Sequence, residues 1–393
     1  CRNHRNHVGV AMKSFYDHPS DPDFFTPGAE AQAIADQLRQ IASPDETRAV
    51  MARWSQAPAF NLLGVPAEYP SHQPHLQDYQ HIRLTERYRL YEKVAFISPI
   101  LMFSAPGPGM AAFAVAGLGT EQQQDAFFNR FQQTLSWSCF AMTEPAQGSD
   151  AGAMETTASP VDGGYLLCGR KMFIGNGMIA DTGVIFARTA PGPLGINAFI
   201  FNPQSAEISR YALELNGLKG TNLAHMQFDD LFIPEADMLG RHLKPTERFA
   251  KSAIATFDAL RPCVGALALG VARRALHEWQ HERRLTPSQS AWLSQMERRW
   301  LVVYHHGLRV CQQTEDKLAP ENHPGMVKTS CVILAEELIC GLIHRTPARD
   351  MRLLNTLWQA FRDVKAFEYT EGTRQIHRLN QGFSRPQEVN TCL

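Results

Sequence analysis

The segment FAMTEPAQGSD, from Phe140 to Asp150, marks the point where the pattern of the chain changes. After it come short apolar or alternating runs, such as GYLLCGRKMFI and INAFIFN. Turn-forming dipeptides separate these runs, which is the pattern of an antiparallel sheet. The dipeptides are Asp162-Gly163, Asn176-Gly177, Pro191-Gly192 and Asn216-Gly217. The sequence therefore predicts a β-domain in the middle of the chain.

Helical patterns flank this region on both sides. The segments Ser43 to Glu46 and Thr120 to Gln123 have the spacing of helix capping boxes, and we expect the first of these helices to run to Trp54. After residue 245, apolar residues recur at intervals of three and four, and Thr286-Pro287 precedes one of these runs. They predict long helices that pack as a four-helix bundle.

The order of these patterns predicts an α+β fold: an N-terminal helical domain, a central antiparallel β-domain and a C-terminal four-helix bundle. The opening residues lack an initiator methionine, and we expect a disordered leader or cloning remnant there, with Met12 as the natural start. The expected divisions are 1–20 for the leader, 21–134 for the helical domain, 135–243 for the β-domain and 244–393 for the bundle.

The composition is that of an ordinary globular protein. Of the 393 residues, 44% are hydrophobic and 20% are charged, and the net charge is -1. This balance provides no strong field to attract nucleic acid, and no apolar run is long enough to span a membrane. The eight cysteines show no C-x-x-C spacing, which indicates reduced thiols and a cytoplasmic location.

Four segments carry the patterns that suggest chemistry. They are FAMTEPAQGSD, GRKMFIGNG (Gly169 to Gly177), FDALRP (Phe257 to Pro262) and FRDVKAFEYTEGTRQIHR (Phe361 to Arg378). In this order they resemble T-E-P-x-A-G-S-D, K-x-W-I-[TS]-N-G, F-D-x-[TS]-R-P and R-D…E-G-T of the flavin-dependent acyl-CoA dehydrogenases. The resemblance covers roughly residues 55 to 382. It implies the fold of that family, FAD as cofactor and an oxidoreductase activity.

The first segment combines groups that suit a flavin. Met142-Thr143 and Gly148-Ser149 supply backbone groups, a hydroxyl and a glycine that permits close approach. By itself the loop is equally consistent with an ordinary β-turn rich in small polar residues. The resemblance implies a wider set of FAD-binding residues: Phe140, Met142, Thr143, Gly148, Ser149, Phe173, Gly175, Arg283, Thr373 and Gln375.

Glu371, in YTEGTRQI, is the candidate catalytic residue. Oxidation of an acyl thioester needs a base for the α-proton, and a carboxylate whose pKa is raised by burial serves this purpose. The alternative is a glutamate that stabilises the start of a helix. The resemblance implies that Gly372 lets the chain approach the cofactor. We expect Arg261 to support Glu371, with Asp258 or Glu371 as its partner.

HEWQH, from His277 to His281, matches the zinc-protease signature H-E-x-x-H. Its flanks are the cationic pairs Arg273-Arg274 and Arg283-Arg284, which disfavour a dication, and no third ligand stands at a recognisable spacing. We therefore expect an exposed helix face and no metal. Arg362-Asp363 is likewise expected to be an ion pair on a helix surface.

The chain also departs from the family. Arg283 is followed by RLTPSQS where the family has R-x-x-F-G, and EELICGLIHRT stands in place of Q-x-x-G-G-x-G. These losses predict a diverged enzyme of secondary metabolism. Its expected substrate is a short polar acyl group on an acyl carrier protein, an extender unit for a polyketide or nonribosomal peptide. The arginine pairs at 273/274, 283/284 and 298/299 could meet an acidic carrier, although such pairs are usually solvated helix faces.

Other functions remain open at this stage. They are an acyl-CoA dehydrogenase of ordinary CoA-ester catabolism, a flavin oxidase or monooxygenase on the same fold, a zinc hydrolase, and a flavin-free scaffold. Retention of Glu371 argues against the monooxygenases, which do not need that base. Besides the thioester on CoA or carrier protein, we expect an electron acceptor and assembly as a homodimer or homotetramer.

Overall fold

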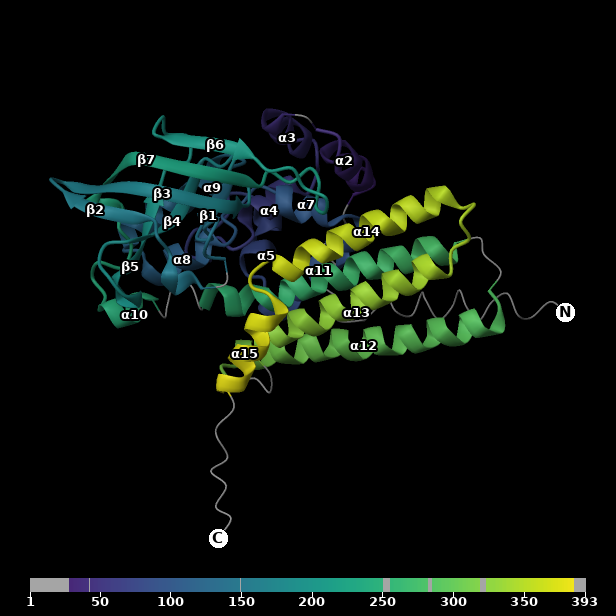
Figure 1. Cartoon of the computed structure of the whole chain (residues 1–393). Helices are drawn as coiled ribbons and strands as arrows, with labels where there is room; N and C mark the ends of the chain where they lie inside the picture. Colours follow the sequence, from purple (N-terminus) through teal and green to yellow (C-terminus); the bar gives the residue numbers. More distant parts are fainter. Residues whose placement is uncertain are drawn as a thin grey trace, which may run out of the picture.

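The computed structural model describes residues 28–41, 43–148, 150–249, 255–281, 285–318 and 323–384. Helices precede and follow a central sheet, so the predicted α+β class is confirmed. Figure 1 shows the sheet and the early helices in one part of the molecule, and the long helices of the bundle in the other. Within the described residues, no helix combines the length and the apolar character needed to cross a membrane.

The N-terminal part is built from short helices around buried aromatic side chains. They are α2 (Ala31–Leu38), α3 (Pro44–Met51), α4 (Ala57–Leu62), η1 (Pro74–Leu76), α5 (Gln77–Gln80), α6 (Leu84–Ile97), α7 (Pro99–Ser104), α8 (Ala111–Leu118) and α9 (Glu121–Gln133). The Thr120 capping box is confirmed. The Ser43 box is wrong, because the Ser43 backbone carbonyl accepts the Glu46 N–H at 3.2 Å and its side chain makes no cap bond. That helix also ends three residues before Trp54.

The sheet contains seven strands among the described residues. They are β1 (Ser138–Ala141), β2 (Thr157–Val161), β3 (Gly164–Ile174), β4 (Thr182–Arg188), β5 (Ile196–Phe201), β6 (Ile208–Ala212) and β7 (Ala224–Pro234). Their order is β1-β4-β2-β3-β7-β6, with β5 also paired to β4. Most pairs are antiparallel, as predicted, but β1 and β2 each run parallel to β4. Cys139, Ile185 and Phe199 belong to the core that lies against this sheet.

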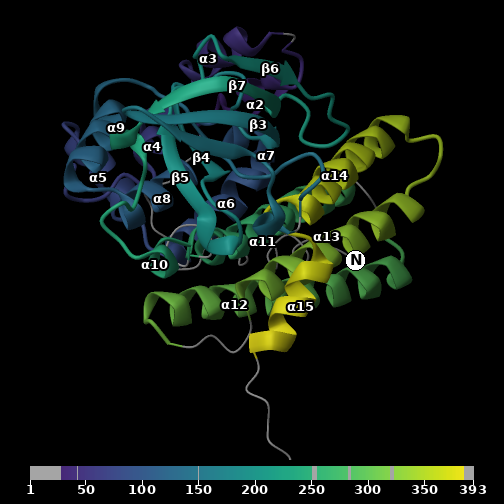
Figure 2. The ribbon, with the colours of Figure 1, turned by 60° about the vertical axis from the view of Figure 1, so that its left-hand side comes forward.

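The remaining elements begin with η2 (Ala151–Ala153), η3 (Pro193–Gly195), η4 (Glu235–Asp237) and α10 (Pro245–Phe249) around the sheet. The bundle consists of α11 (Ala255–Gln280), α12 (Pro287–Glu315), α13 (Pro324–His344) and α14 (Met351–Tyr369), followed by α15 (Arg374–Ser384). Thr286 caps α12 as predicted. In Figures 1 and 2, α11 lies between the sheet-bearing part and the rest of the bundle. It is therefore the element that connects the two halves of the site.

Candidate active site

Two of the predicted cofactor-binding segments lie side by side. The loop that follows β1 is joined to the end of β3 by the Met172 N–H, which donates to the Thr143 carbonyl at 2.8 Å. Lys171 Nζ donates to the Met142 carbonyl at 3.0 Å. The sheet thus holds the FAMTEP loop beside the KMFIG turn.

A buried ion pair, to which the sequence interpretation assigned no role, fixes this junction. Lys171 Nζ lies 2.9 Å from Glu144 Oε1, and the side chains are 0% and 4% exposed. Burial lowers the pKa of Lys171 to about 8, although Glu144 opposes the shift. Burial raises the pKa of Glu144, but Lys171 and the N–H groups of Glu155 and Thr156 outweigh that effect and lower it. The signal was present in both motifs, as the E of TEP and the K of GRKMF.

Phe173 adopts a conformation that an ordinary strand residue avoids. Its φ is +59°, and the pairing of β3 with β7 is irregular between Lys171 and Ile174. A bulge of this kind redirects a side chain, and a bulky residue at positive φ signals a constrained site. The Phe173 ring is 57% exposed.

Gly148, in the FAMTEP loop, and Gly175, in the KMFIG turn, both have open space beside them. A Cβ at Gly148 or at Gly175 would meet no atom within 4 Å. The exposed Phe173 ring and these open positions fit a flat ring system such as a flavin. Met142 is buried, and Phe140 and Thr143 are half-buried in the same region. Ser149 lies outside the described residues.

Glu371 stands in the turn between α14 and α15. Its φ of +56° and the φ of +101° at Gly372 place two successive residues in the left-handed region. Lys328 on α13, which is 1% exposed, stabilises this turn. Its ammonium group donates to the carbonyls of Thr370 and Gly372, and to that of Glu368 at 3.2 Å. A turn that is strained at a non-glycine residue is therefore held by a buried cation.

The Glu371 carboxyl group is buried away from water, and the nearby cations offset only part of the resulting cost to its charged form. Its residue is half-buried, but Oε2 is inaccessible to solvent and has no hydrogen-bond partner in the described part of the chain. Burial raises the pKa of Glu371 to about 7, while Lys328 and then Arg261 act to lower it. A carboxyl group in this state exchanges protons near neutral pH.

Arg261 connects this turn to the sheet. Its Nε donates to the Glu371 carbonyl at 3.1 Å, and its Nη1 lies 3.0 Å from Asp258 Oδ1. The guanidinium carbon lies 5.2 Å from the centroid of the Phe257 ring, which meets the Phe140 ring at 6.1 Å. A continuous row of side chains therefore runs from β1, through α11, to Glu371.

The residues after Glu371 lie at the start of α15. Thr373 is half-buried and Gln375 is exposed. His377, which sequence reasoning did not single out, is 0% exposed, and the Gly372 backbone packs against its ring. Burial, followed by Lys328 and Arg261, lowers the pKa of His377 to about 3, so this histidine is neutral.

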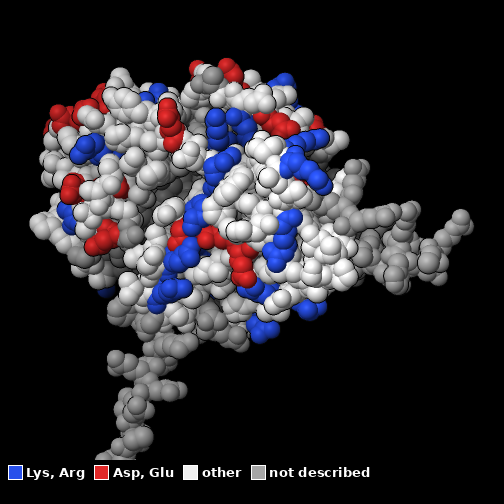
Figure 3. Space-filling model, turned by 45° about the vertical axis from the view of Figure 1, so that its right-hand side comes forward, with Lys and Arg blue, Asp and Glu red and all other residues white. Residues whose placement is uncertain are grey.

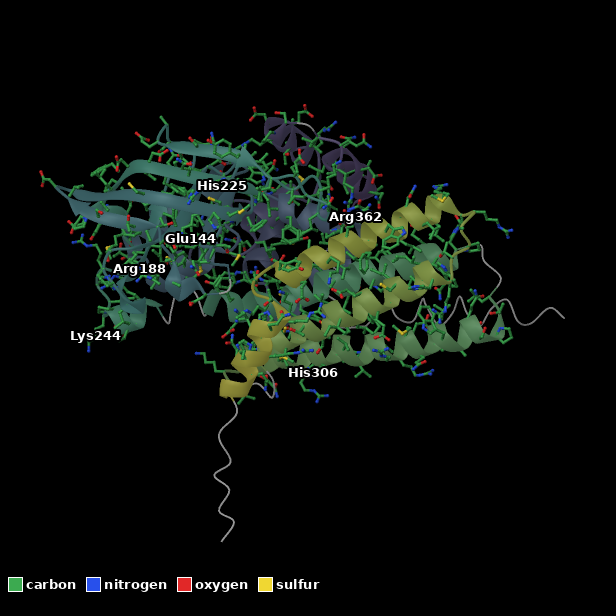
Figure 4. All side chains as sticks on the ribbon, in the orientation of Figure 1. Glu144, Arg188, His225, Lys244, His306 and Arg362 are labelled. Atoms are coloured by element: carbon green, nitrogen blue, oxygen red, sulfur yellow. The ribbon has the colours of Figure 1, made fainter. Side chains whose placement is uncertain are left out.

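The expected surface ion pair between Arg362 and Asp363 is wrong. Asp363 is 2% exposed and pairs with Arg39 at 2.6 Å, and it also accepts the Leu218 N–H at 2.7 Å. Because Leu218 has a φ of +54°, Asp363 fixes an irregular loop against α14. Arg362 lies exposed on α14 and donates to Gln359 instead (Figure 4).

HEWQH covers the last residues of α11 and the residue after it; His277 and His281 are exposed, and their ring centroids are 6.4 Å apart. Among the described residues, no group of three or more His, Cys, Asp or Glu side chains is arranged to hold a metal ion. Of the arginines around it, Arg273 is buried and makes a two-bond pair with Glu92 at 2.5 and 2.8 Å. Arg273 is therefore not available to a carrier protein.

Two further segments depart from the family pattern. Arg283 and Arg284 lie outside the described residues. The segment EELICGLIHRT, Glu336 to Thr346, forms the end of α13 and the turn after it. Glu336 pairs there with Lys365 at 2.9 Å and with Arg374 at 3.3 Å. These contacts are internal to the chain and stabilise the bundle near Glu371.

Comparisons with known proteins agree with this architecture. Residues 139–231 match the acyl-CoA dehydrogenase middle domain. An acyl-CoA dehydrogenase of Bacillus subtilis is 40% identical over 162 residues, which are 40% of this chain and 41% of that protein. A short-chain specific acyl-CoA dehydrogenase of Clostridium acetobutylicum is 29% identical over 66% of this chain and 71% of its own length. The chain thus spans less than half of the first relative.

The crystal structure of acyl-CoA dehydrogenase from Geobacillus kaustophilus superimposes with a TM-score of 0.76 at 17% identity, over 98% of each chain. The chain therefore contains a segment that matches the acyl-CoA dehydrogenase middle domain, and it has the fold of acyl-CoA dehydrogenases of known structure; a glutaryl-CoA dehydrogenase of Mycobacterium smegmatis with this fold was solved in complex with FADH2.

Proposed function

We propose that this chain is an FAD-dependent dehydrogenase that oxidises an acyl thioester, with Glu371 as the catalytic base. The observation that carries the proposal is the Glu371 carboxyl group, which has a buried, unpartnered Oε2 and a pKa of about 7. A substantial fraction of such a base is ionised at neutral pH. Because the carboxylate is already buried, substrate binding removes little further water from it.

The residues that would hold FAD come from three segments. The loop from Phe140 to Gly148 and the Phe173–Gly175 turn would contact the ring system, and Thr373 and Gln375 would reach it from α15. Ser149 and Arg283 complete the proposed set from outside the described residues. When bound, FAD supplies a two-electron acceptor for the hydride that leaves the β-carbon of the acyl group.

The chain's own residues would handle the proton. Glu371 takes the α-proton, and its loss together with the β-hydride leaves a double bond between the two carbons. The Glu371 N–H would donate to the thioester carbonyl, where negative charge develops. Lys328 and Arg261 hold the backbone carbonyls on either side of that N–H, so they would keep it in place.

The test is the visible spectrum of the purified protein, recorded anaerobically before and after addition of short acyl thioesters. A yellow protein whose flavin is bleached by a thioester is expected. A protein that takes up no FAD, or whose flavin no thioester bleaches, would contradict the proposal. Oxygen consumption without an added acceptor would indicate an oxidase instead.

We also propose an acyl carrier protein, rather than CoA, as the carrier of the acyl group. Besides the lost family motifs, the support is a set of exposed basic residues on and beside α14: Arg349, Arg352 and Arg362. Lys and Arg side chains recur over the face of the molecule shown in Figure 3. Bleaching by carrier-bound but not CoA-bound thioester is the expected result, and equal rates would favour ordinary CoA-ester catabolism.

The electrons would leave the flavin to an external acceptor, and the protein would assemble as a homodimer or homotetramer. Sedimentation equilibrium measures the assembly directly. A monomer that retains FAD and activity would contradict this part of the proposal.

A further inference from the structure

The His377 ring lies directly against the turn that carries Glu371. His377 is on the first turns of α15 and is 0% exposed, and its backbone N–H donates to the Thr373 carbonyl at 3.1 Å. From there the ring packs against Gly372, the residue after Glu371. A Cβ built at Gly372 would lie 3.0 Å from His377 Cε1 and 3.4 Å from Nε2. The ring is therefore in contact with the backbone of the turn itself.

The same ring contacts the start of α13. A Cβ built at Gly325 would lie 2.2 Å from His377 Nδ1, so the ring needs a residue without a side chain there. Gly325 is held in place, because its N–H donates to His323 Nδ1 at 3.1 Å and its carbonyl accepts the Thr329 hydroxyl at 2.9 Å. The His323 N–H also donates to Gln381 Oε1 on α15 at 2.7 Å. The ring thus fills the space between two anchored segments.

The ring carries no charge, although it lies among cations. Burial lowers the pKa of His377 to about 3, and Lys328, Arg261 and His323 act in the same direction. A contact with the Gly372 backbone opposes them. The charges that lower the pKa of Glu371 are those of Lys328 and Arg261. His377 therefore supplies shape beside the turn without adding a third positive charge.

The turn needs such support because its backbone is unusual. Glu371 and Gly372 both have positive φ, and a glycine has more conformational freedom than any other residue. Lys328 and Arg261 bind the carbonyl oxygens of the turn. The His377 ring occupies the space into which Gly372 could otherwise move. The cations and the ring thus restrain different atoms of the same turn.

We propose that His377 is a positioning residue for Glu371: its ring, held between Gly325 and Gly372, keeps the turn in the conformation that directs the Glu371 carboxylate at the substrate. This inference rests on the proposed function, because it takes Glu371 as the base. A misplacement of about 1 Å can lower a rate by about 100-fold. Loss of the ring should therefore slow flavin reduction at saturating thioester more than it weakens binding of FAD or thioester.

The first variant removes the ring. His377→Ala should lower the rate constant of flavin reduction by about tenfold or more, because Gly372 can then move and Glu371 with it. The loss should persist at about pH 9, where Glu371 is almost fully ionised. A change in the pKa of Glu371 alone would lose its effect at that pH. His377→Asn, which retains a flat neutral group, should recover part of the rate.

The second variant displaces the ring from the α13 side. Gly325→Ala places a methyl group where the ring now lies, so it should slow flavin reduction in the same way. In the His377→Ala background the methyl group has no ring to displace, and Gly325→Ala should cost nothing further. Gly341→Ala is the matched control near the other end of α13. Its Cβ would be just as crowded, 2.3 Å from an atom of the Trp292 ring, but it should leave the rate unchanged.

The measurement is anaerobic stopped-flow flavin reduction of each FAD-loaded protein, with saturating thioester at pH 7 and about pH 9. A wild-type rate in His377→Ala, or a loss that disappears at the higher pH, would overturn the inference and leave the dehydrogenase intact. An equal loss in Gly325→Ala and Gly341→Ala would also overturn it. If no thioester bleaches the wild-type flavin, the proposed function fails and the inference fails with it. Should His377→Ala not fold, Gly325→Ala against Gly341→Ala still decides.

Discussion

Replacing Lys328 by glutamine is expected to move the pH profile of flavin reduction to higher pH. Glu371 must be ionised to act as a base, so the rate rises as pH increases through its pKa of about 7. The Lys328 charge lowers that pKa, and its removal therefore raises it. Glutamine keeps an N–H donor for the carbonyls that Lys328 now satisfies.

The size of the shift follows from the strength of one buried charge pair. Two unit charges about 4 Å apart interact by about 4 kcal/mol at an effective dielectric constant of about 20, and one pKa unit corresponds to about 1.4 kcal/mol. A rise of about one unit is a moderate expectation on that scale. At pH 7 the ionised fraction of Glu371 would fall from about a half to about a tenth, so the rate drops about fivefold. At about pH 9, where Glu371 is almost fully ionised in both proteins, the rates of the wild type and Lys328→Gln should converge.

The assay is anaerobic single-turnover flavin reduction, measured at a series of pH values with saturating thioester. Lys365→Gln is the control, because Lys365 is partly exposed and pairs with Glu336 rather than with the Glu371 turn. Lys328→Arg retains the charge and should keep the midpoint near that of the wild type. A Lys328→Gln protein that keeps its FAD but shows an unchanged or lower midpoint would refute the reasoning.

Three further predictions concern the junction with the sheet and the loop at α14. Lys171→Met leaves the Glu144 carboxylate buried and unpaired, so the free energy of unfolding should fall by about 3–5 kcal/mol; a smaller loss than in an exposed Lys→Met variant would contradict this. Phe173→Ala should weaken FAD binding about tenfold with little change in Tm, because the ring is 57% exposed; unchanged retention of FAD on dilution would count against the stacking role. Asp363→Ala should cost about 1–3 kcal/mol in chemical denaturation, because it orphans the Leu218 N–H and Arg39; a neutral result would show that the loop needs no anchor.

The fold was largely predictable because its signals are local. Turn dipeptides and short apolar runs identified the strands, and the capping residues Thr120 and Thr286 identified two helix starts. The Ser43 box failed for a local reason as well, since a backbone carbonyl took the bond that the side chain was expected to make. The parallel pairing of β1 with β4 was missed, because strand direction depends on the whole topology rather than on the strands themselves.

The candidate site was predictable only for residues that stand within a recognisable sequence motif. Glu371 and Phe173 stand in recognisable segments, but their environments come from distant residues. Asp363 meets Arg39 across 324 positions, and such pairings leave no trace in spacing or periodicity.

The most direct test of the account is anaerobic flavin reduction by the preferred thioester in the wild type and in Glu371→Gln. The account predicts a Glu371→Gln protein that folds, binds FAD and binds substrate, yet whose flavin stays oxidised, because no base takes the α-proton. Bleaching of its flavin at the wild-type rate would remove Glu371 from the chemistry and contradict the central claim.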